Sequence, residues 1–115
     1  MKDFRLDEIA ELIDKKKLSE AQTKLSRLGP EFLKNTEYLF LRSKIFYLNK
    51  LYYIALDTLL IATEFDEKDK VYDLISEIYN ILGNKELSRK VSDNSTRSEA
   101  IKSLKNEVTG ISQKE

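Results

Sequence analysis

The sequence predicts an all-α fold, and three observations support that prediction. Its 115 residues include only one Pro and three Gly, and 35% of them are charged, a composition typical of helical proteins. Apolar and small residues recur at helical spacing, most clearly between Thr36 and Asp69. A related pattern returns about every 34 residues along the chain. Together these features predict a series of antiparallel helix pairs, which we call hairpins.

The segment 36–69 predicts two helices joined by a very short turn. Only Asn49 and Lys50 separate the two apolar patterns, and so short a link forces the helices to run antiparallel. Small residues stand where large ones would keep the helices apart. The residues expected to face the opposite helix are Leu39, Ser43 and Phe46 in the first helix and Tyr52, Ala55, Leu59 and Ala62 in the second.

The same pattern predicts one hairpin before this segment and one after it. Ala21 lies 34 residues before Ala55, within a similar run of Leu and Ala residues. Ser88 lies 33 residues after Ala55 and follows a predicted turn at Gly83–Asn84. Before that turn, the spacing of Leu39, Ser43 and Phe46 is repeated by Tyr72, Ser76 and Tyr79. Three units at one period predict a repeat protein.

The first hairpin should carry recognisable helix ends. We expect its first helix at about Asp3–Asp14, with an apolar side made of Phe4, Ile9, Leu12 and Ile13. Its second helix should begin near Ser19, where Ser19 and Gln22 have the spacing of a capping box. Gly29–Pro30 should end that helix, with Gly29 in the left-handed conformation and Pro30 unable to continue the hydrogen-bond ladder.

The pattern weakens after a fifth helix at about Lys70–Leu82. A second capping box at Thr96–Glu99 predicts a further helix, whose apolar stripe is Ala100, Ile101, Leu104 and Val108 and which covers the end of the array. A single long helix from Lys85 to Val108 is the alternative. The predicted organisation is a helical array over 1–93, a capping helix over 94–109 and a flexible tail over 110–115.

Composition excludes several classes of function. Twenty basic and twenty acidic residues cancel, so the sequence predicts no nucleic-acid binding and no polybasic membrane anchor. The chain has no Cys and no His, which excludes disulfides, thiolate metal sites and catalysis by either side chain. Carboxylate pairs one turn apart, such as Asp7–Glu11 and Asp73–Glu77, are interpreted as solvated helix surfaces. We therefore expect no enzyme, no cofactor and no metal site.

Hydropathy predicts a soluble, cytoplasmic protein. The first residues lack the apolar run of a signal peptide. The most hydrophobic window, 40–62, is interrupted by Arg42, Lys44, Asn49, Lys50 and Asp57, which favours two packed helices over a membrane span.

The spacing of large and small residues around Leu39, Ser43, Ala55 and Leu59 resembles the tetratricopeptide repeat (TPR) family, over about Lys2 to Val91. The resemblance implies a right-handed α-solenoid of about three hairpins, and a protein-binding groove lined by the first helix of each. The family's carboxylate clamp for chaperone tails needs Lys and Asn in the first helix, where this sequence has Leu6 and Ala10, and basic residues in the fifth, where Lys70 stands alone beside two acidic residues, so that binding mode is not expected. Carried over to this sequence, the groove positions are Leu6, Ala10, Ile13, Glu37, Phe40, Lys44, Tyr47, Leu48, Lys70, Asp73, Glu77 and Asn80.

The predicted centre of the partner site is Phe40, Lys44 and Tyr47. Helical spacing puts these side chains opposite the expected core of their helix, where an exposed apolar patch around a cation is typical of an interaction site. Leu48, and Lys70, Asp73 and Glu77 on the fifth helix, complete the predicted partner-binding residues. The expected partner is a peptide or helix of another protein. Two alternatives remain open: a chaperone for a secreted or assembled subunit, and a structural component that self-associates through the stripe from Ala100 to Val108.

Overall fold

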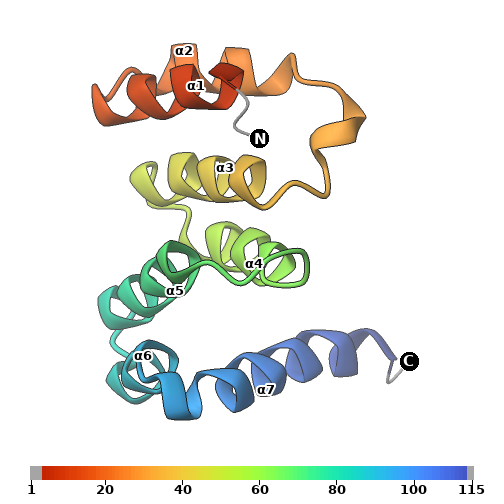
Figure 1. Cartoon of the computed structure of the whole chain (residues 1–115). Coiled ribbons are helices and arrows are strands. Elements are labelled where there is room, and N and C mark those ends of the chain that lie inside the picture. The colour runs from red at the N-terminus through yellow and green to blue at the C-terminus, as the bar shows by residue number, and fades with distance from the viewer. Residues whose placement is uncertain (1–3, 114–115) are drawn as a thin grey trace. The chain divides into compact units, whose positions relative to one another are not determined.

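The computed structural model describes the backbone of residues 4–113 and the side chains of residues 4–106, and every regular element in that range is helical (Figure 1). The chain divides into two compact units, Met1–Glu67 and Lys68–Glu115, with the division inside the predicted 1–93 array. The all-α prediction is confirmed. None of the described helices is long and apolar enough to cross a membrane. The elements are α1 (Phe4–Asp14), α2 (Leu18–Ser26), the 3-10 helix η1 (Pro30–Phe32), α3 (Thr36–Leu48), α4 (Tyr52–Ala62), α5 (Asp69–Ile81), α6 (Lys85–Ser92) and α7 (Asn94–Gln113).

In the first unit, α3 is the central helix because it packs against α1, α2 and α4. The small and apolar positions predicted to let α3 and α4 approach are buried, and they include Ser43, Ala55 and Leu59. The Thr36 hydroxyl also donates a hydrogen bond of 3.3 Å to the carbonyl of Ala62, which ties the start of α3 to the end of α4. Phe46 and Tyr52, also expected in this core, are only half-buried.

One turn geometry occurs three times, at the links from α1 to α2, α3 to α4 and α5 to α6. Lys16, Lys50 and Gly83 have φ angles of 61°, 63° and 88°, the left-handed conformation that ends many helices. Each donates its N–H to the carbonyl three residues back, and the following residue donates to the carbonyl five residues before it, which defines a Schellman motif. These turn residues are 34 and 33 residues apart, so the predicted sequence period is also a period of backbone conformation.

The N-cap residues of the following helices α2, α4 and α6 also share one backbone conformation. Lys17, Leu51 and Asn84 have φ/ψ angles of −91°/66°, −94°/70° and −95°/78°. Their carbonyls accept the first helical N–H, from Ala21, Ala55 and Ser88, at 3.0, 3.1 and 3.1 Å. The three small residues aligned in the sequence therefore occupy the same place relative to the three turns.

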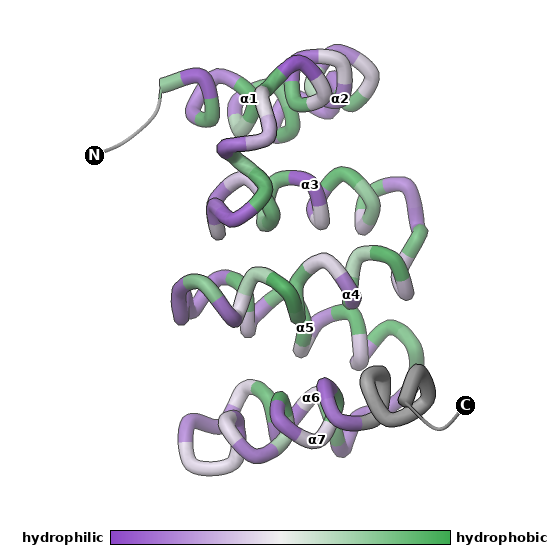
Figure 2. Tube along the Cα trace, turned by 90° about the vertical axis from the view of Figure 1, so that its right-hand side faces the viewer, coloured by the Kyte–Doolittle hydropathy of each residue, from purple (hydrophilic) through white to green (hydrophobic). Residues whose placement is uncertain are grey.

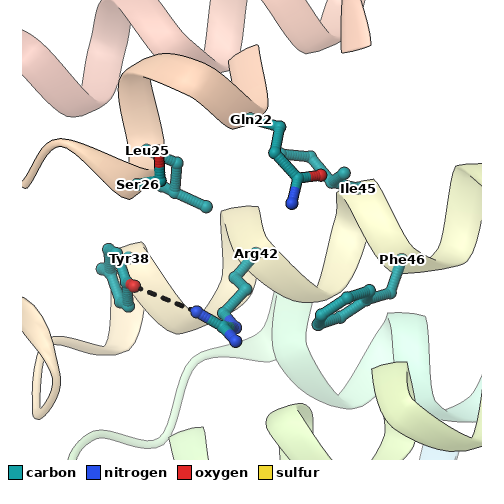
Figure 3. Close-up of a pocket in the computed structure, with 7 residues that line it drawn as sticks. All are labelled: Gln22, Leu25, Ser26, Tyr38, Arg42, Ile45 and Phe46. Atoms are coloured by element: carbon teal, nitrogen blue, oxygen red, sulfur yellow. Dashed lines mark hydrogen bonds between the residues drawn. The ribbon is translucent and has the colours of Figure 1, made fainter. Parts of the chain in front are cut away.

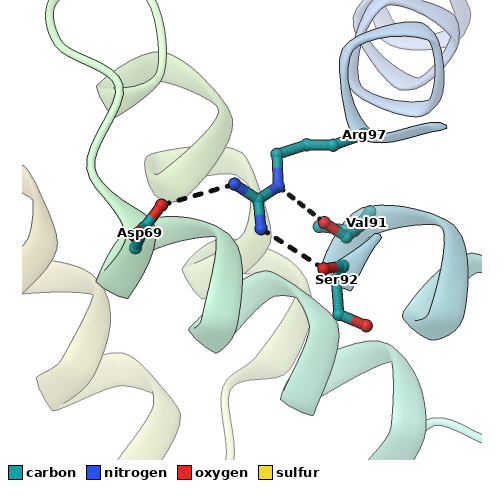
Figure 4. Close-up of polar contacts among 4 residues, drawn as sticks. All are labelled: Asp69, Val91, Ser92 and Arg97. Atoms are coloured by element: carbon teal, nitrogen blue, oxygen red, sulfur yellow. Dashed lines mark hydrogen bonds and ion pairs between the residues drawn. The ribbon is translucent and has the colours of Figure 1, made fainter. Parts of the chain in front are cut away.

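In the second unit, α6 packs against α5 and α7. The Ser76 hydroxyl on α5 donates to the carbonyl of Ser88 at 2.7 Å, so this close approach is polar. Arg97 of α7 contacts both α5 and α6. Its guanidinium lies 4.4 Å from the Tyr72 ring centroid on α5 and donates to the carbonyls of Val91 and Ser92 on α6 (Figure 4). Figure 2 shows mainly hydrophilic residues along α6, in contrast to the hydrophobic α4.

Three expectations for the first helix pair are wrong. Phe4 is 75% exposed and does not join the apolar side of α1. The N-cap residue of α2 is Lys17, two places before Ser19, and it makes no side-chain cap, so the Ser19–Gln22 capping box is not formed. Gly29 is extended, with φ −76° and ψ 174°, because it precedes the 3-10 helix at Pro30 and does not terminate α2. The left-handed residues follow α1, α3 and α5 instead.

The C-terminal region also differs in its helix ends. Asp93, with φ −86° and ψ 119°, breaks the chain between α6 and α7, so the alternative of one helix over 85–108 is wrong. Its carboxylate accepts hydrogen bonds from the N–H and hydroxyl of Ser95, and Thr96 lies inside α7 instead of opening it. The helix continues to Gln113, into the segment expected to be a tail.

The apolar stripe of α7 is used inside the second unit. Ala100, Ile101 and Leu104 are buried, and α7 packs against α6. This agrees with a covering helix and contradicts the alternative that these three residues form an exposed self-association surface. The side chain of Val108 lies outside the described residues.

Candidate functional site

The three residues predicted as the centre of a partner site differ in accessibility. Phe40 is only 9% exposed, so the prediction that it stands outside the core is wrong. The Lys44 ammonium lies 5.8 Å from the Phe40 ring centroid, and Lys44 is half-buried over that ring. Tyr47 and Leu48 are also half-buried, and the Tyr47 ring meets the Tyr52 ring edge-on at a centroid distance of 6.0 Å. What remains accessible is Lys44 with parts of Tyr47 and Leu48.

The other groove positions divide between core and surface. Leu6 and Ile13 on α1 are buried, 4% and 1% exposed, which contradicts their predicted display in a groove. Lys70, Asp73 and Glu77 are exposed and follow one another along a single side of α5 at helical spacing. They belong to the second unit, whereas Lys44, Tyr47 and Leu48 belong to the first. The predicted site residues therefore form two small groups, one on α3 in the first unit and one on α5 in the second.

A hollow between α2 and α3 was not predicted from the sequence. Figure 3 shows the side chain of Gln22 pointing from α2 toward α3, whereas the side chain of Arg42 runs along α3 between Tyr38 and Phe46. The Arg42 guanidinium receives support from two sides, since it donates to the Tyr38 hydroxyl at 3.3 Å and lies 5.5 Å from the Phe46 ring centroid. The remaining residues that line the hollow are Leu25, Ser26 and Ile45. An arginine held in this way can donate to an anionic or carbonyl oxygen.

A second feature missed by the sequence reasoning is the outward side of α4. Tyr53 is 71% exposed, Ile54 and Ile61 are each 49% exposed, and Phe65 in the turn after the helix is 42% exposed. The signal was present in the sequence, because these residues alternate with the core positions Ala55, Leu59 and Ala62. It was hidden by the high overall hydrophobicity of the segment, which masks amphipathic character.

Ionisable groups give no sign of a reaction centre in the described part of the chain. No group of three or more acidic residues there could hold a metal ion. The pKa of Glu86 is lowered by its hydrogen bond and ion pair with Lys90, and the pKa of Asp93 is lowered by the hydrogen bonds from Ser95. Both carboxyl groups belong to helix ends. No protein-family model, curated protein or solved structure matches the chain.

Proposed function

We propose that the chain is a TPR-like protein-interaction module, in which three antiparallel hairpins form a right-handed solenoid and α7 covers its last hairpin. It would act without catalysis and take up a peptide or helix of a partner protein. The observation that carries the proposal is the Schellman turn repeated at Lys16, Lys50 and Gly83. A repeated turn of one geometry, followed each time by a small residue one helical turn later, is what a stacked hairpin repeat requires.

Repetition favours binding over catalysis for a physical reason. Each hairpin hides only one of its sides against the next, so a series of hairpins presents a long surface built from equivalent positions. Such a surface suits an extended or helical ligand held by many small contacts. The absence of Cys and His from the sequence removes the thiol nucleophile and the commonest general base, which agrees with a binding role.

The accessible α3 residues mark the proposed partner site. Lys44 can pair with an acidic or carbonyl group, and the exposed parts of Tyr47 and Leu48 add apolar contact area. The buried ring of Phe40 supports the Lys44 side chain, with its centroid 5.8 Å from the ammonium. Lys70, Asp73 and Glu77 on α5 are proposed as the partner-binding residues of the second unit.

The test is affinity capture with the whole chain as bait. A double variant, Lys44→Glu with Tyr47→Ala, is compared with the parent and with Lys102→Glu, which makes the same charge change at an exposed position of α7. We expect the parent and Lys102→Glu to retain the same proteins, and the double variant to lose them. Retention by all three baits would place the binding surface elsewhere, and no selective retention by the parent would refute the interaction function.

A further inference from the structure

The outward side of α4 has the spacing of a helix-binding surface. Ile54 and Ile61 are seven residues apart and so lie on one side of α4, and the exposed Phe65 follows in the turn after the helix; we call these three residues the apolar stripe. Each is between 42% and 49% exposed, and the more exposed Tyr53 lies beside them. Single exposed apolar residues are ordinary, whereas a continuous row of large ones usually marks an interaction site. The opposite side of α4 is already occupied by the core of the first unit.

The charges along this stripe have one sign. From Leu51 to Glu67 the sequence contains four acidic residues and no Lys or Arg. Asp57 is exposed on α4, between Ile54 and Ile61 in the sequence, and Glu64 is exposed in the turn next to Phe65; we call these carboxylates the acidic row. Asp66 and Glu67 follow at the end of the same segment and are also exposed. The surface is therefore apolar along one edge and acidic along the other.

This combination selects among possible occupants. An anionic membrane or a nucleic acid would be repelled by the acidic row. A second copy packed antiparallel through the same surface would set Asp57 and Glu64 on the same edge as their own equivalents, which is unfavourable at an interface. A helix with apolar residues on one side and Lys or Arg along one edge satisfies both rows at once.

We propose that the outward side of α4 is a docking surface for a basic amphipathic helix of a partner protein. It is a second surface of this chain and does not depend on the proposed α3 site, because the two sites share no residue. The apolar stripe supplies the buried area, and the acidic row fixes the edge on which the basic residues of the partner lie.

The probe is a pair of synthetic helical peptides with capped ends. Both carry Leu at positions spaced three and four residues apart, and one carries Lys along one edge of that stripe where the other carries Glu. Binding to the whole chain is followed by fluorescence anisotropy at several salt concentrations. We expect the Lys peptide to bind at least tenfold more tightly than the Glu peptide, with an affinity that falls as salt rises.

Variants locate the site. The pair Ile54→Ser and Ile61→Ser should weaken binding of the Lys peptide at least tenfold, and the pair Asp57→Asn and Glu64→Gln should weaken it and reduce its salt dependence. Ile81→Ser is the matched control, because Ile81 is 46% exposed on α5 and the same change there should leave binding intact. Lys44→Glu with Tyr47→Ala should also bind normally, which separates this proposal from the α3 site.

Three results would overturn the proposal. The first is no binding of the Lys peptide to a parent chain whose circular dichroism is helical. The second is equal binding of the Lys and Glu peptides, or equal loss in Ile81→Ser, since either would mean unselective adhesion to apolar residues. The third is a parent that sediments as a dimer and becomes a monomer in Ile54→Ser with Ile61→Ser, which would make a second copy the occupant.

Discussion

The repeated turn predicts that exchanging Gly and Ala changes the free energy of unfolding. The direction of that change depends on whether the backbone at the substituted position is left-handed. At 83 the parent residue is Gly, with φ +88°, and a methyl group added there would meet nothing within 4 Å. The cost of Gly83→Ala therefore comes from the backbone alone. A left-handed L-residue costs roughly 1–2 kcal/mol, and the greater freedom of Gly in the unfolded chain returns about 0.4–1 kcal/mol. We expect Gly83→Ala to lower the free energy of unfolding by about 0.5–1 kcal/mol.

The lysine turns give the same comparison without a change in charge between variants. Lys50→Gly and Lys50→Ala both remove the ammonium group, so their difference isolates the backbone conformation at φ 63°. Gly should be more stable than Ala there by about 0.5–1 kcal/mol, and likewise at Lys16, where φ is 61°. Urea unfolding followed by circular dichroism at fixed protein concentration measures each difference.

Gly29 serves as the control, because its φ of −76° is open to any residue. A methyl group at 29 would meet the carboxylate of the exposed Glu31, a flexible side chain that can rotate away. Gly29→Ala should therefore be neutral or stabilising by up to about 1 kcal/mol. If Ala proved as stable as Gly at 16, 50 and 83, the shared turn conformation would be wrong, and with it the main support for a repeat.

Three further predictions concern the core and the helix ends. Leu59→Ala removes a side chain with no exposed surface and should cost about 2–5 kcal/mol in urea unfolding, with exposed Leu33→Ala as its neutral comparison. Arg97→Met should cost about 1–2 kcal/mol through its lost carbonyl and Tyr72 contacts, whereas Asp69→Asn should cost under about 0.5 kcal/mol, because the Asp69 side chain is 92% exposed. The hydrogen bonds from Ser95 lower the pKa of Asp93, so its carboxylate stabilises the fold above the unfolded pKa and loses that effect as pH falls through the folded value. The difference in urea midpoint between the parent and Asp93→Asn should therefore shrink as pH falls below the usual aspartate value of 3.8.

The positions of the helices were predictable from the sequence because apolar spacing determines them. The bounds of α3 match the pattern at both ends, and those of α5 differ from it by one residue at each end. The turn conformations were only partly predictable. A Gly at position 83 predicts a left-handed residue, whereas Lys16 and Lys50 adopt that conformation because a link of only three residues joins two antiparallel helices. Residue type alone placed the left-handed residue at Gly29, where the following Pro30 instead begins a 3-10 helix.

The partner site was harder to predict, since exposure depends on how many neighbours a helix has. Tyr38, Leu39, Phe40 and Leu41 are consecutive and all buried, which no single apolar stripe can explain. They are buried because α3 has neighbours on several sides, from α1, α2 and α4. A helix wheel with one core side therefore assigns Phe40 to the surface. The same reasoning gave no role to Ile54 and Ile61, because it assigned only the residues of α4 that face α3.

This difference between α3 and α4 leads to a final prediction about Phe40. A residue that binds a partner loses affinity when truncated, whereas a residue of the core loses stability. Phe40 is 9% exposed and carries Lys44 over its ring, so Phe40→Ala should lower the free energy of unfolding by about 3 kcal/mol or more. Tyr53→Ala, at a residue 71% exposed, should change it by less than about 0.5 kcal/mol. Urea unfolding of the two variants gives the comparison, and an unchanged midpoint for Phe40→Ala would return Phe40 to the surface and restore α3 as the apolar binding face. Loss of stability in Phe40→Ala would instead confirm that Phe40 belongs to the core, and Lys44, Tyr47 and Leu48 would remain the accessible residues of the proposed α3 site.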